Sequence, residues 1–134
     1  MSVLAIGQNM YPYGSFNTRN FDYSDQKGEF ENWDIIQNND GYIYVANNEA
    51  VLEYNGSTWF KFEFENKEHP RSFAKNAEGT IFVGGQGEFG KIVYNEKGMA
   101  MIEKLSGAFD FLELNDVWQV YCIHAQTYLV TRNH

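Results

Sequence analysis

The sequence predicts an all-β domain made of propeller-type blades, each a small sheet of four antiparallel strands. Three observations support this prediction. Short runs rich in aromatic and β-branched residues alternate with turns that contain Gly, Asn or Asp, a pattern typical of strands joined in series. Residues 32–64 hold four such runs, which is about the length of one blade. The runs then repeat with a period near 40 residues, as in propellers.

The first predicted blade covers residues 28–66. Its four strands are expected at residues 33–37, 42–46, 50–54 and 59–64. Asp40-Gly41 and Asn55-Gly56 are expected to form tight turns, because glycine adopts the positive φ that such turns need. The fourth run alternates aromatic and charged side chains, which is the period-2 pattern of a half-buried outer strand.

The second predicted blade, residues 67–105, repeats the first. Residues 34–48 align with residues 72–86 without a gap, across a turn and its two flanking strands. The fourth strand of this blade is expected at residues 99–105. Pro70 marks the boundary between the blades, because proline cannot donate a hydrogen bond within a sheet.

A weaker third copy, residues 106–134, predicts a partial blade. Its strands are expected at residues 117–120 and 127–130, with His124-Ala125 in place of the turn glycine. Three such units cannot close a ring, so the ring is expected to be open unless molecules associate. The alternative is an ordinary antiparallel sandwich whose internal similarity is coincidental.

Residues 1–27 are predicted to be an N-terminal arm with one or two short strands, because they combine turn-forming residues and aromatics without a helical period. The arm is expected either to cap the first blade or to reach a neighbouring molecule. Residues 1–7 form only a short apolar run without a basic flank, so they do not make a convincing signal peptide.

The composition bounds the class of protein. A chain of 134 residues with 43% hydrophobic and 17% aromatic residues can form one β domain with a core, residues 1–134. The formal net charge of −8 argues against nucleic acid and anionic membranes as partners. No run approaches the roughly 18 apolar residues of a membrane span, so no membrane insertion is predicted.

A glycine motif invites one functional interpretation. Residues 85–90 (GQGEFG) match the dinucleotide-binding pattern G-x-G-x-x-G. That chemistry needs a helix N-terminus after the glycines to hold the pyrophosphate. Residues 91–95 indicate a strand followed by a turn, so the glycines are better explained by a tight loop between two strands.

No catalytic residues, metal site or cofactor are predicted. The three histidines, His69, His124 and His134, lack metal-ligand spacing. Cys122 is the only cysteine, which excludes an intrachain disulfide and favours a small buried side chain over a Cys-His dyad with His124. A cluster of acidic residues, Glu29, Glu31 and Asp34, is expected to be a solvated rim in preference to a glycosidase pair.

One face of the blades is a candidate binding surface. If the first strand of each blade leads outward, the loop before it and the loop between strands two and three share one face. The residues expected there are Trp33, Asn47, Asn48, Arg71, Gln86, Glu88 and Phe89. Polar amides, a Trp and an Arg suit a polar small ligand such as a carbohydrate. The alternative is that Trp33 packs in the core and the asparagines only serve the turns.

The segments that carry the repeat also resemble a known family. They are Asn32-Trp33-Asp34-Ile35, residues 44–48, residues 52–56, Trp59, residues 71–74, and residues 79–85 running into Gly87-Glu88-Phe89-Gly90. Together they resemble two-component regulator propeller repeats, which form the sensor region of hybrid two-component systems and triple-tyrosine regulators of Bacteroidetes-type bacteria. The resemblance covers about residues 20–120 and implies an N-terminal piece of a larger sensor.

The resulting expectation is a non-enzymatic ligand-sensing or recognition module, exposed to the periplasm or the cell exterior as the resemblance implies. The absence of a recognisable signal peptide leaves the cytoplasm open. The alternative is a structural, self-assembling β protein that completes a ring as a homo-oligomer. A propeller enzyme, a lyase or glycosidase, is disfavoured because no acid–base constellation stands out. The expected partners are a polar ligand and either further copies or the remainder of a sensor.

Overall fold

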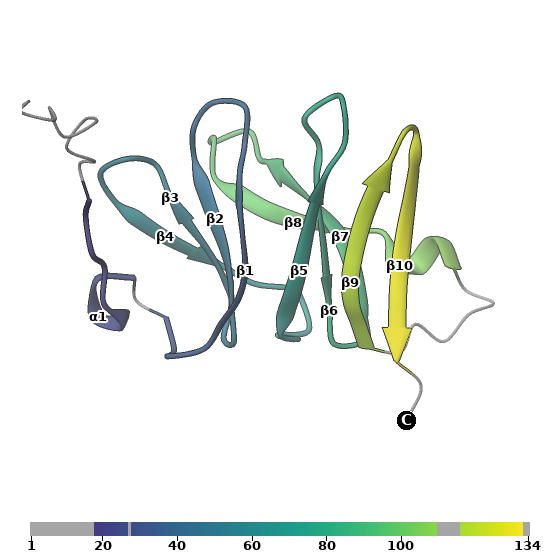
Figure 1. Cartoon of the computed structure of the whole chain (residues 1–134), viewed down its shortest axis with the longest axis horizontal. Coiled ribbons are helices and arrows are strands. Elements are labelled where there is room, and N and C mark those ends of the chain that lie inside the picture. The colour runs from purple at the N-terminus through teal and green to yellow at the C-terminus, as the bar shows by residue number, and fades with distance from the viewer. Residues whose placement is uncertain (1–17, 27, 110–115, 133–134) are drawn as a thin grey trace, which may run out of the picture.

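The computed structural model describes residues 18–26, 28–109 and 116–132, and it confirms the all-β prediction. Three antiparallel sheets follow one another along the chain (Figure 1). The first unit contains β1 (Asn32–Gln37), β2 (Ile43–Asn47), β3 (Val51–Tyr54) and β4 (Trp59–Phe62). The second contains β5 (Pro70–Lys75), β6 (Ile81–Gly85), β7 (Glu88–Tyr94) and β8 (Ala100–Lys104). The third contains β9 (Asp116–Ile123) and β10 (Gln126–Arg132).

Each four-stranded unit is a simple meander with neighbouring strands in sequence order. The first strands of the three units, β1, β5 and β9, lie side by side across the centre of the molecule (Figure 1). The sheets pack face to face in series and do not close on themselves. The strand boundaries differ from those predicted by one or two residues at most ends, as at β2 and β8.

The turns are formed by the predicted residues and repeat between units. In the first unit the Asn38 side chain accepts hydrogen bonds from the N–H groups of Asp40 (3.0 Å) and Tyr42 (2.8 Å), and Gly41 has φ +89°. In the second unit Asn76 accepts from Thr80 (2.8 Å), and the turn again contains a glycine with positive φ. The third unit lacks that glycine, and His124 itself adopts φ +55°.

The sheets are joined by two apolar cores. Between the first and second units, Tyr44, Ala46 and Val51 pack against residues of the second sheet, including Phe73 and Val83. Between the second and third units, a second cluster is formed by Ala74, Phe89, Val117 and Val120. The repeat in the sequence therefore corresponds to a repeat in packing, in which each sheet covers one face of the next.

The described part of the arm lies on the outer face of the first sheet. Phe21 contacts Tyr54 and Trp59 edge to face, with ring centroids 4.9 and 5.3 Å apart. The segment contains a one-turn helix, α1 (Tyr23–Gln26), and no strand among its described residues. The strands predicted for the rest of the arm fall outside the described residues. A 3₁₀ helix, η1 (Ser106–Phe109), follows β8.

Candidate functional site

Three bulges bring one side chain from each unit together. In β1 the pairing with β2 shifts register between Asn32 and Asp34, so that Trp33 is the extra residue. The same shift occurs between Pro70 and Ser72 in β5, which leaves Arg71 as the extra residue. A β-bulge re-aims the side chain of its extra residue and twists the strand.

The third bulge lies in β9. Its pairing with β10 shifts between Val117 and Gln119, so the extra residue is Trp118. A repeated hydrogen bond supports this alignment of the units. The Asp34 carboxylate accepts from the N–H of Phe73 at 2.7 Å, and the Ser72 hydroxyl accepts from the N–H of Val120 at 3.2 Å. Trp33, Arg71 and Trp118 therefore occupy equivalent positions, and we call them the bulge triad.

The bulge triad forms a continuous contact. The Arg71 guanidinium carbon lies 4.4 Å from the ring centroid of Trp33 and 4.7 Å from that of Trp118. The two indole rings are perpendicular, with centroids 6.3 Å apart, so Arg71 occupies the corner between them. Such cation–π contacts contribute about 0.5–2 kcal/mol each, depending on exposure. The arginine is thus held in position by aromatic faces.

The triad borders a pocket of about 450 Å³ on the inner strands of the three units. Its other walls include Asp34, Lys75 and Gln119. Trp33 remains 43% exposed, so part of its ring is accessible to solvent. The pocket therefore combines aromatic faces with charged and amide side chains.

The polar atoms that lack partners concentrate at this pocket. Among the described residues, three buried side-chain nitrogens have no hydrogen-bond acceptor: Nε of Arg71, Nε1 of Trp118, and Nε1 of Trp59 on the outer face of the first sheet. Two of the three belong to the bulge triad. A buried N–H without an acceptor costs about 1–3 kcal/mol. Both nitrogens are themselves shielded from solvent, so they mark an energetic cost at the triad and are not surface that a ligand reaches in this conformation.

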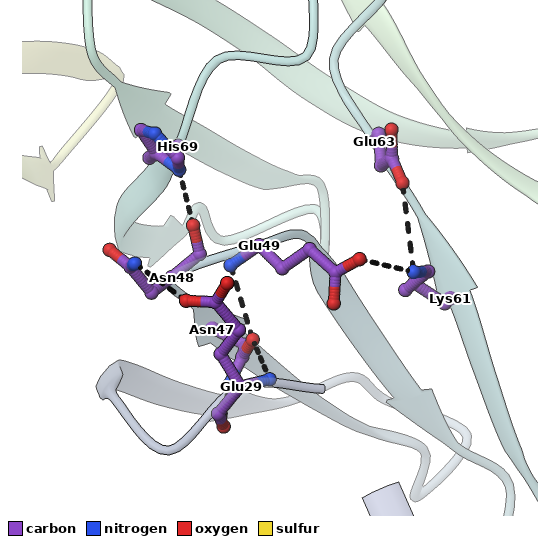
Figure 2. A network of polar contacts seen from close by, with 7 residues as sticks. All are labelled: Glu29, Asn47, Asn48, Glu49, Lys61, Glu63 and His69. Carbon is purple, nitrogen blue, oxygen red and sulfur yellow. Dashed lines mark hydrogen bonds and ion pairs between the residues drawn. The ribbon is translucent and has the colours of Figure 1, made fainter. Parts of the chain in front are cut away.

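Two of the other predicted residues serve the loops. Asn47 is fully buried, and its amide donates to the carbonyls of Glu29 (2.7 Å) and Glu31 (3.1 Å) while accepting from the N–H groups of Glu29 (2.9 Å) and Glu49 (3.1 Å). Asn48 donates to the Glu29 carboxylate (2.9 Å), and its carbonyl contacts His69 Nδ1 (Figure 2). These amides anchor the loop before β1 and do not reach the bulge triad.

Glu88 and Phe89 also lie away from the bulge triad. Glu88 is 3% exposed and accepts hydrogen bonds from Lys104 (2.8 Å), Ser106 (2.8 Å) and the Asn66 amide. Phe89 is buried and stacks on Phe82 with centroids 5.8 Å apart. Of the residues predicted to share one binding face, Trp33 and Arg71 are the two that belong to the bulge triad.

Gln86 lies in the hairpin turn that explains the glycine motif. Its backbone N–H donates to the His69 carbonyl at 3.1 Å. Gln86-Gly87 joins β6 to β7, and Gly87 has φ +67°. The prediction of a strand-to-strand loop is confirmed, and the helix that a dinucleotide site needs is not present at this position.

The remaining chemical candidates have structural partners. No group of three or more His, Cys, Asp or Glu residues within the described ranges is arranged to hold a metal ion. The expectation that Asp34 belongs to a merely solvated rim is wrong, because its carboxylate bridges two sheets through Phe73. Cys122 Sγ lies 3.8 Å from the Thr127 hydroxyl.

A second polar contact joins the first two sheets through Tyr94. Its hydroxyl donates to the carboxylate of Glu53 at 2.9 Å and contacts the hydroxyl of Tyr44. Burial raises the pKa of Tyr94 to about 12, and burial together with the Tyr94 hydrogen bond raises the pKa of Tyr44 further. Both phenols therefore stay protonated at neutral pH and act as hydrogen-bond donors and not as bases.

Sequence reasoning missed Trp118 and Lys75 as pocket residues. An alignment of Val120 with Phe73 would have placed Trp118 opposite Arg71. That alignment was not found from the sequence, because the third repeat lacks the turn glycine on which the other alignments depend. Lys75 lies at the far end of β5 from Pro70 and donates to the Gln37 carbonyl at 2.8 Å.

Comparison with family models, curated proteins and solved structures finds no match to this chain. The family resemblance noted in the sequence therefore stays a prediction. No helix among the described residues is long and apolar enough to cross a membrane.

Proposed function

We propose that this chain is a non-enzymatic recognition module made of propeller-type blades, which binds a polar ligand at the bulge triad. One observation carries the proposal: three successive units each place their bulged residue, Trp33, Arg71 or Trp118, against the same pocket. Bulges are common beside binding sites because they re-aim side chains. If these side chains served only to pack the core, an exposed indole and an unpaired guanidinium would not be needed at the same place.

Binding is favoured over catalysis by the chemistry of the pocket. Asp34, its one carboxylate, already accepts from the N–H groups of Phe73 (2.7 Å) and Ile35 (2.8 Å). General acid–base catalysis needs a titratable group free to exchange a proton with the substrate. The pocket instead offers aromatic surface and hydrogen-bond donors. By the resemblance noted in the sequence, we place this module in the sensor part of a two-component regulator, facing the periplasm or the cell exterior.

Tryptophan fluorescence tests the proposal directly, because two of the three tryptophans belong to the bulge triad. A panel of neutral and acidic oligosaccharides is titrated into the protein, and at least one is expected to shift the emission. Trp33→Ala should abolish the shift. Trp59→Phe, on the outer face of the first sheet, is the matched control and should retain it. A panel that leaves the emission unchanged up to about 10 mM ligand, well above ordinary dissociation constants, would count against ligand binding.

A second candidate function, self-assembly, is favoured by the outward face of the third unit. Its paired strands expose Tyr121, Ile123, Tyr128 and Val130, each between 45% and 51%. The opposite face of the same two strands packs on the second unit. An exposed apolar sheet face of this kind marks an interaction surface.

The occupant that fits this face is the outer face of the first sheet of a second copy. That surface exposes Ile35 at 66% beside an apolar groove of about 370 Å³ that includes Phe21 and Val45. Such a contact continues the series of packed sheets from one molecule to the next. It is heterologous, so it gives a ring if the rotation closes and a filament if it does not.

Light scattering over a range of protein concentrations tests this second candidate. We expect a mass above that of one 15.5 kDa chain, and a return to one chain for the double variant Ile123→Lys and Tyr128→Lys. Met99→Lys, at an equally exposed apolar position in the turn before β8, is the control and should not change the mass. A monomer at all concentrations would contradict the assembly.

A further inference from the structure

We infer that the pocket at the bulge triad recognises a carboxylate group, carried by an acidic sugar. This inference rests on the proposed function and names the class of ligand. It starts from the Arg71 side chain, which lines the pocket and has no hydrogen-bond or ion-pair partner within the described ranges. A guanidinium only donates hydrogen bonds and cannot accept one. The ligand must therefore supply acceptors.

Arg71 is the central donor. A guanidinium carries five N–H donors in a planar fork that matches a carboxylate. Within the described ranges, Arg71 forms no ion pair with an acidic side chain and donates no hydrogen bond. Its contacts are the two indole rings, which orient the guanidinium plane without using the N–H groups. An arginine oriented by aromatic rings and lacking an anion is prepared to bind one.

The charged side chains around Arg71 also favour an anionic ligand. Lys75 borders the pocket, and the guanidinium of Arg132 lies 5.8 Å from the Trp118 ring centroid. Neither forms an ion pair with a carboxylate in the part of the chain that the structure describes. Asp34 is the one carboxylate among the lining residues, against Arg71 and Lys75, so the pocket has more positive than negative side chains in a chain whose formal net charge is −8. This balance favours anions at the pocket.

The aromatic part of the site supplies the reason for a sugar. Trp33 leaves 43% of its surface exposed beside the pocket, and an indole face offers a flat apolar platform. A pyranose ring has an apolar face of similar size and hydroxyl oxygens that accept hydrogen bonds. A uronic acid combines that ring with a carboxylate, which is the group that the Arg71 guanidinium would bind. A simple oxyanion would use only Arg71 and would leave the platform empty.

Calorimetric titration of matched ligand pairs tests the inference. Uronic acid disaccharides are compared with their methyl esters, which keep the ring and lose the charge. We expect at least one acid to bind about tenfold or more tightly than its ester, because charge-assisted hydrogen bonds are roughly twice as strong as neutral ones. Raising the ionic strength from about 0.01 to 1 M should weaken the acid selectively, because the Debye length falls from about 30 to 3 Å.

Two arginine variants supply the matched control. Arg71→Met keeps an apolar stem between the indoles and removes the donors, so binding of the acid should fall about tenfold to a hundredfold while binding of the ester stays the same. Arg71→Lys should lie between the two proteins. Arg19 also lies over aromatic rings, 4.8 Å from Phe21 and 6.0 Å from Tyr54, so Arg19→Met should change neither ligand. Circular dichroism confirms that each variant is folded.

The outcomes separate the inference from the proposed function. If an acid and its ester bind equally and Trp33→Ala removes both, the recognition module stands and the carboxylate inference falls. If acetate or phosphate binds as tightly as the acidic disaccharides, the sugar part falls. If no pair binds at about 10 mM, the proposed function and the inference fall together. If Arg71→Met leaves binding of the acid unchanged, Arg71 is only a structural spacer between the indoles.

Discussion

The two joints between successive sheets share one geometry and differ in chemistry. The first joint packs β1–β4 on β5–β8, and the second packs β5–β8 on β9–β10. In both, a side chain of the earlier inner strand accepts a hydrogen bond from a backbone N–H of the later one. The acceptor is the Asp34 carboxylate at 2.7 Å in the first joint and the Ser72 hydroxyl at 3.2 Å in the second. The two joints therefore share the same backbone register and differ in the group that accepts the hydrogen bond.

The joints also differ in how closely the sheets approach. Ala46 is fully buried at the first joint. The aligned residue at the second joint is Gly84, where an added Cβ would lie 2.5 Å from Cγ1 of Val117 and 2.7 Å from Cγ2 of Val120. A methyl group that fits one joint therefore has no room at the other. The side-chain volume that fits at this position therefore differs between the two joints.

Gly84→Val should have the largest effect, because it overfills the close second joint. We expect a loss of about 3 kcal/mol in the free energy of unfolding, at the upper end of the cost of overpacking. Urea unfolding followed by tryptophan fluorescence measures it. Gly107→Val is the control, since nothing lies within 4 Å of the place that a Cβ would occupy there, and it should change stability by less than about 0.5 kcal/mol. Equal losses would mean that the second joint is not closely packed.

Asp34→Ala and Ser72→Ala compare the acceptors of the two joints. Each change leaves a backbone N–H at a joint without its partner. We expect a loss of about 2 kcal/mol for Asp34→Ala and about 1 kcal/mol for Ser72→Ala, because hydrogen bonds to charged groups contribute more than neutral ones. Asp40→Ala, on an exposed turn, is the control for removing a carboxylate. A larger loss of unfolding free energy for Ser72→Ala than for Asp34→Ala would contradict the expectation that the charged acceptor contributes more.

Tyr94→Phe should have the smallest effect at neutral pH, under about 1 kcal/mol, because Tyr94 is 44% exposed and water can replace the lost hydrogen bond. Its effect should appear in alkali. The pKa of Tyr94 is raised from 10.0 to about 12 in the folded protein. The unfolded chain therefore loses the phenol proton of Tyr94 at a lower pH than the folded chain does. The stability that Tyr94 contributes to the folded state is fully present below pH 10 and is lost as the pH rises through about 12.

The measurement for Tyr94 is the slope of unfolding free energy against pH between about 10 and 12. The wild-type protein should lose stability over this range, and Tyr94→Phe should flatten the slope. Tyr121→Phe, at a half-exposed position of β9, serves as the control for the removal of one phenol. An unchanged slope in Tyr94→Phe would show that the first joint does not hold this phenol in its protonated form.

Local chemistry explains which parts of the fold were predictable. The turns at Gly41 and Gly56 were predictable because positive φ favours glycine, and both adopt it. The hairpin at residues 85–90 was predictable because a strand pattern follows the glycines. The bulge triad was only partly predictable, since a bulge depends on the pairing of two strands and has no residue signature of its own. Trp33 and Arg71 were identified from their loops, and Trp118 was not.

The sequence by itself determined the strands, their turns and the order of the repeated units, because these depend on residues that are near one another in the chain. Tertiary structure alone decided which side chains meet between units. Asn47 and Glu88, predicted at a binding face, were buried by partners in other segments, and Asp34 became a bridge to Phe73. Arg71 met two indoles because three sheets stack with their bulges aligned. The contact of Asp34 with Phe73 and those of Arg71 with the two indoles join residues at least 38 positions apart in the sequence, and only the packing of one sheet on the next brings such residues together.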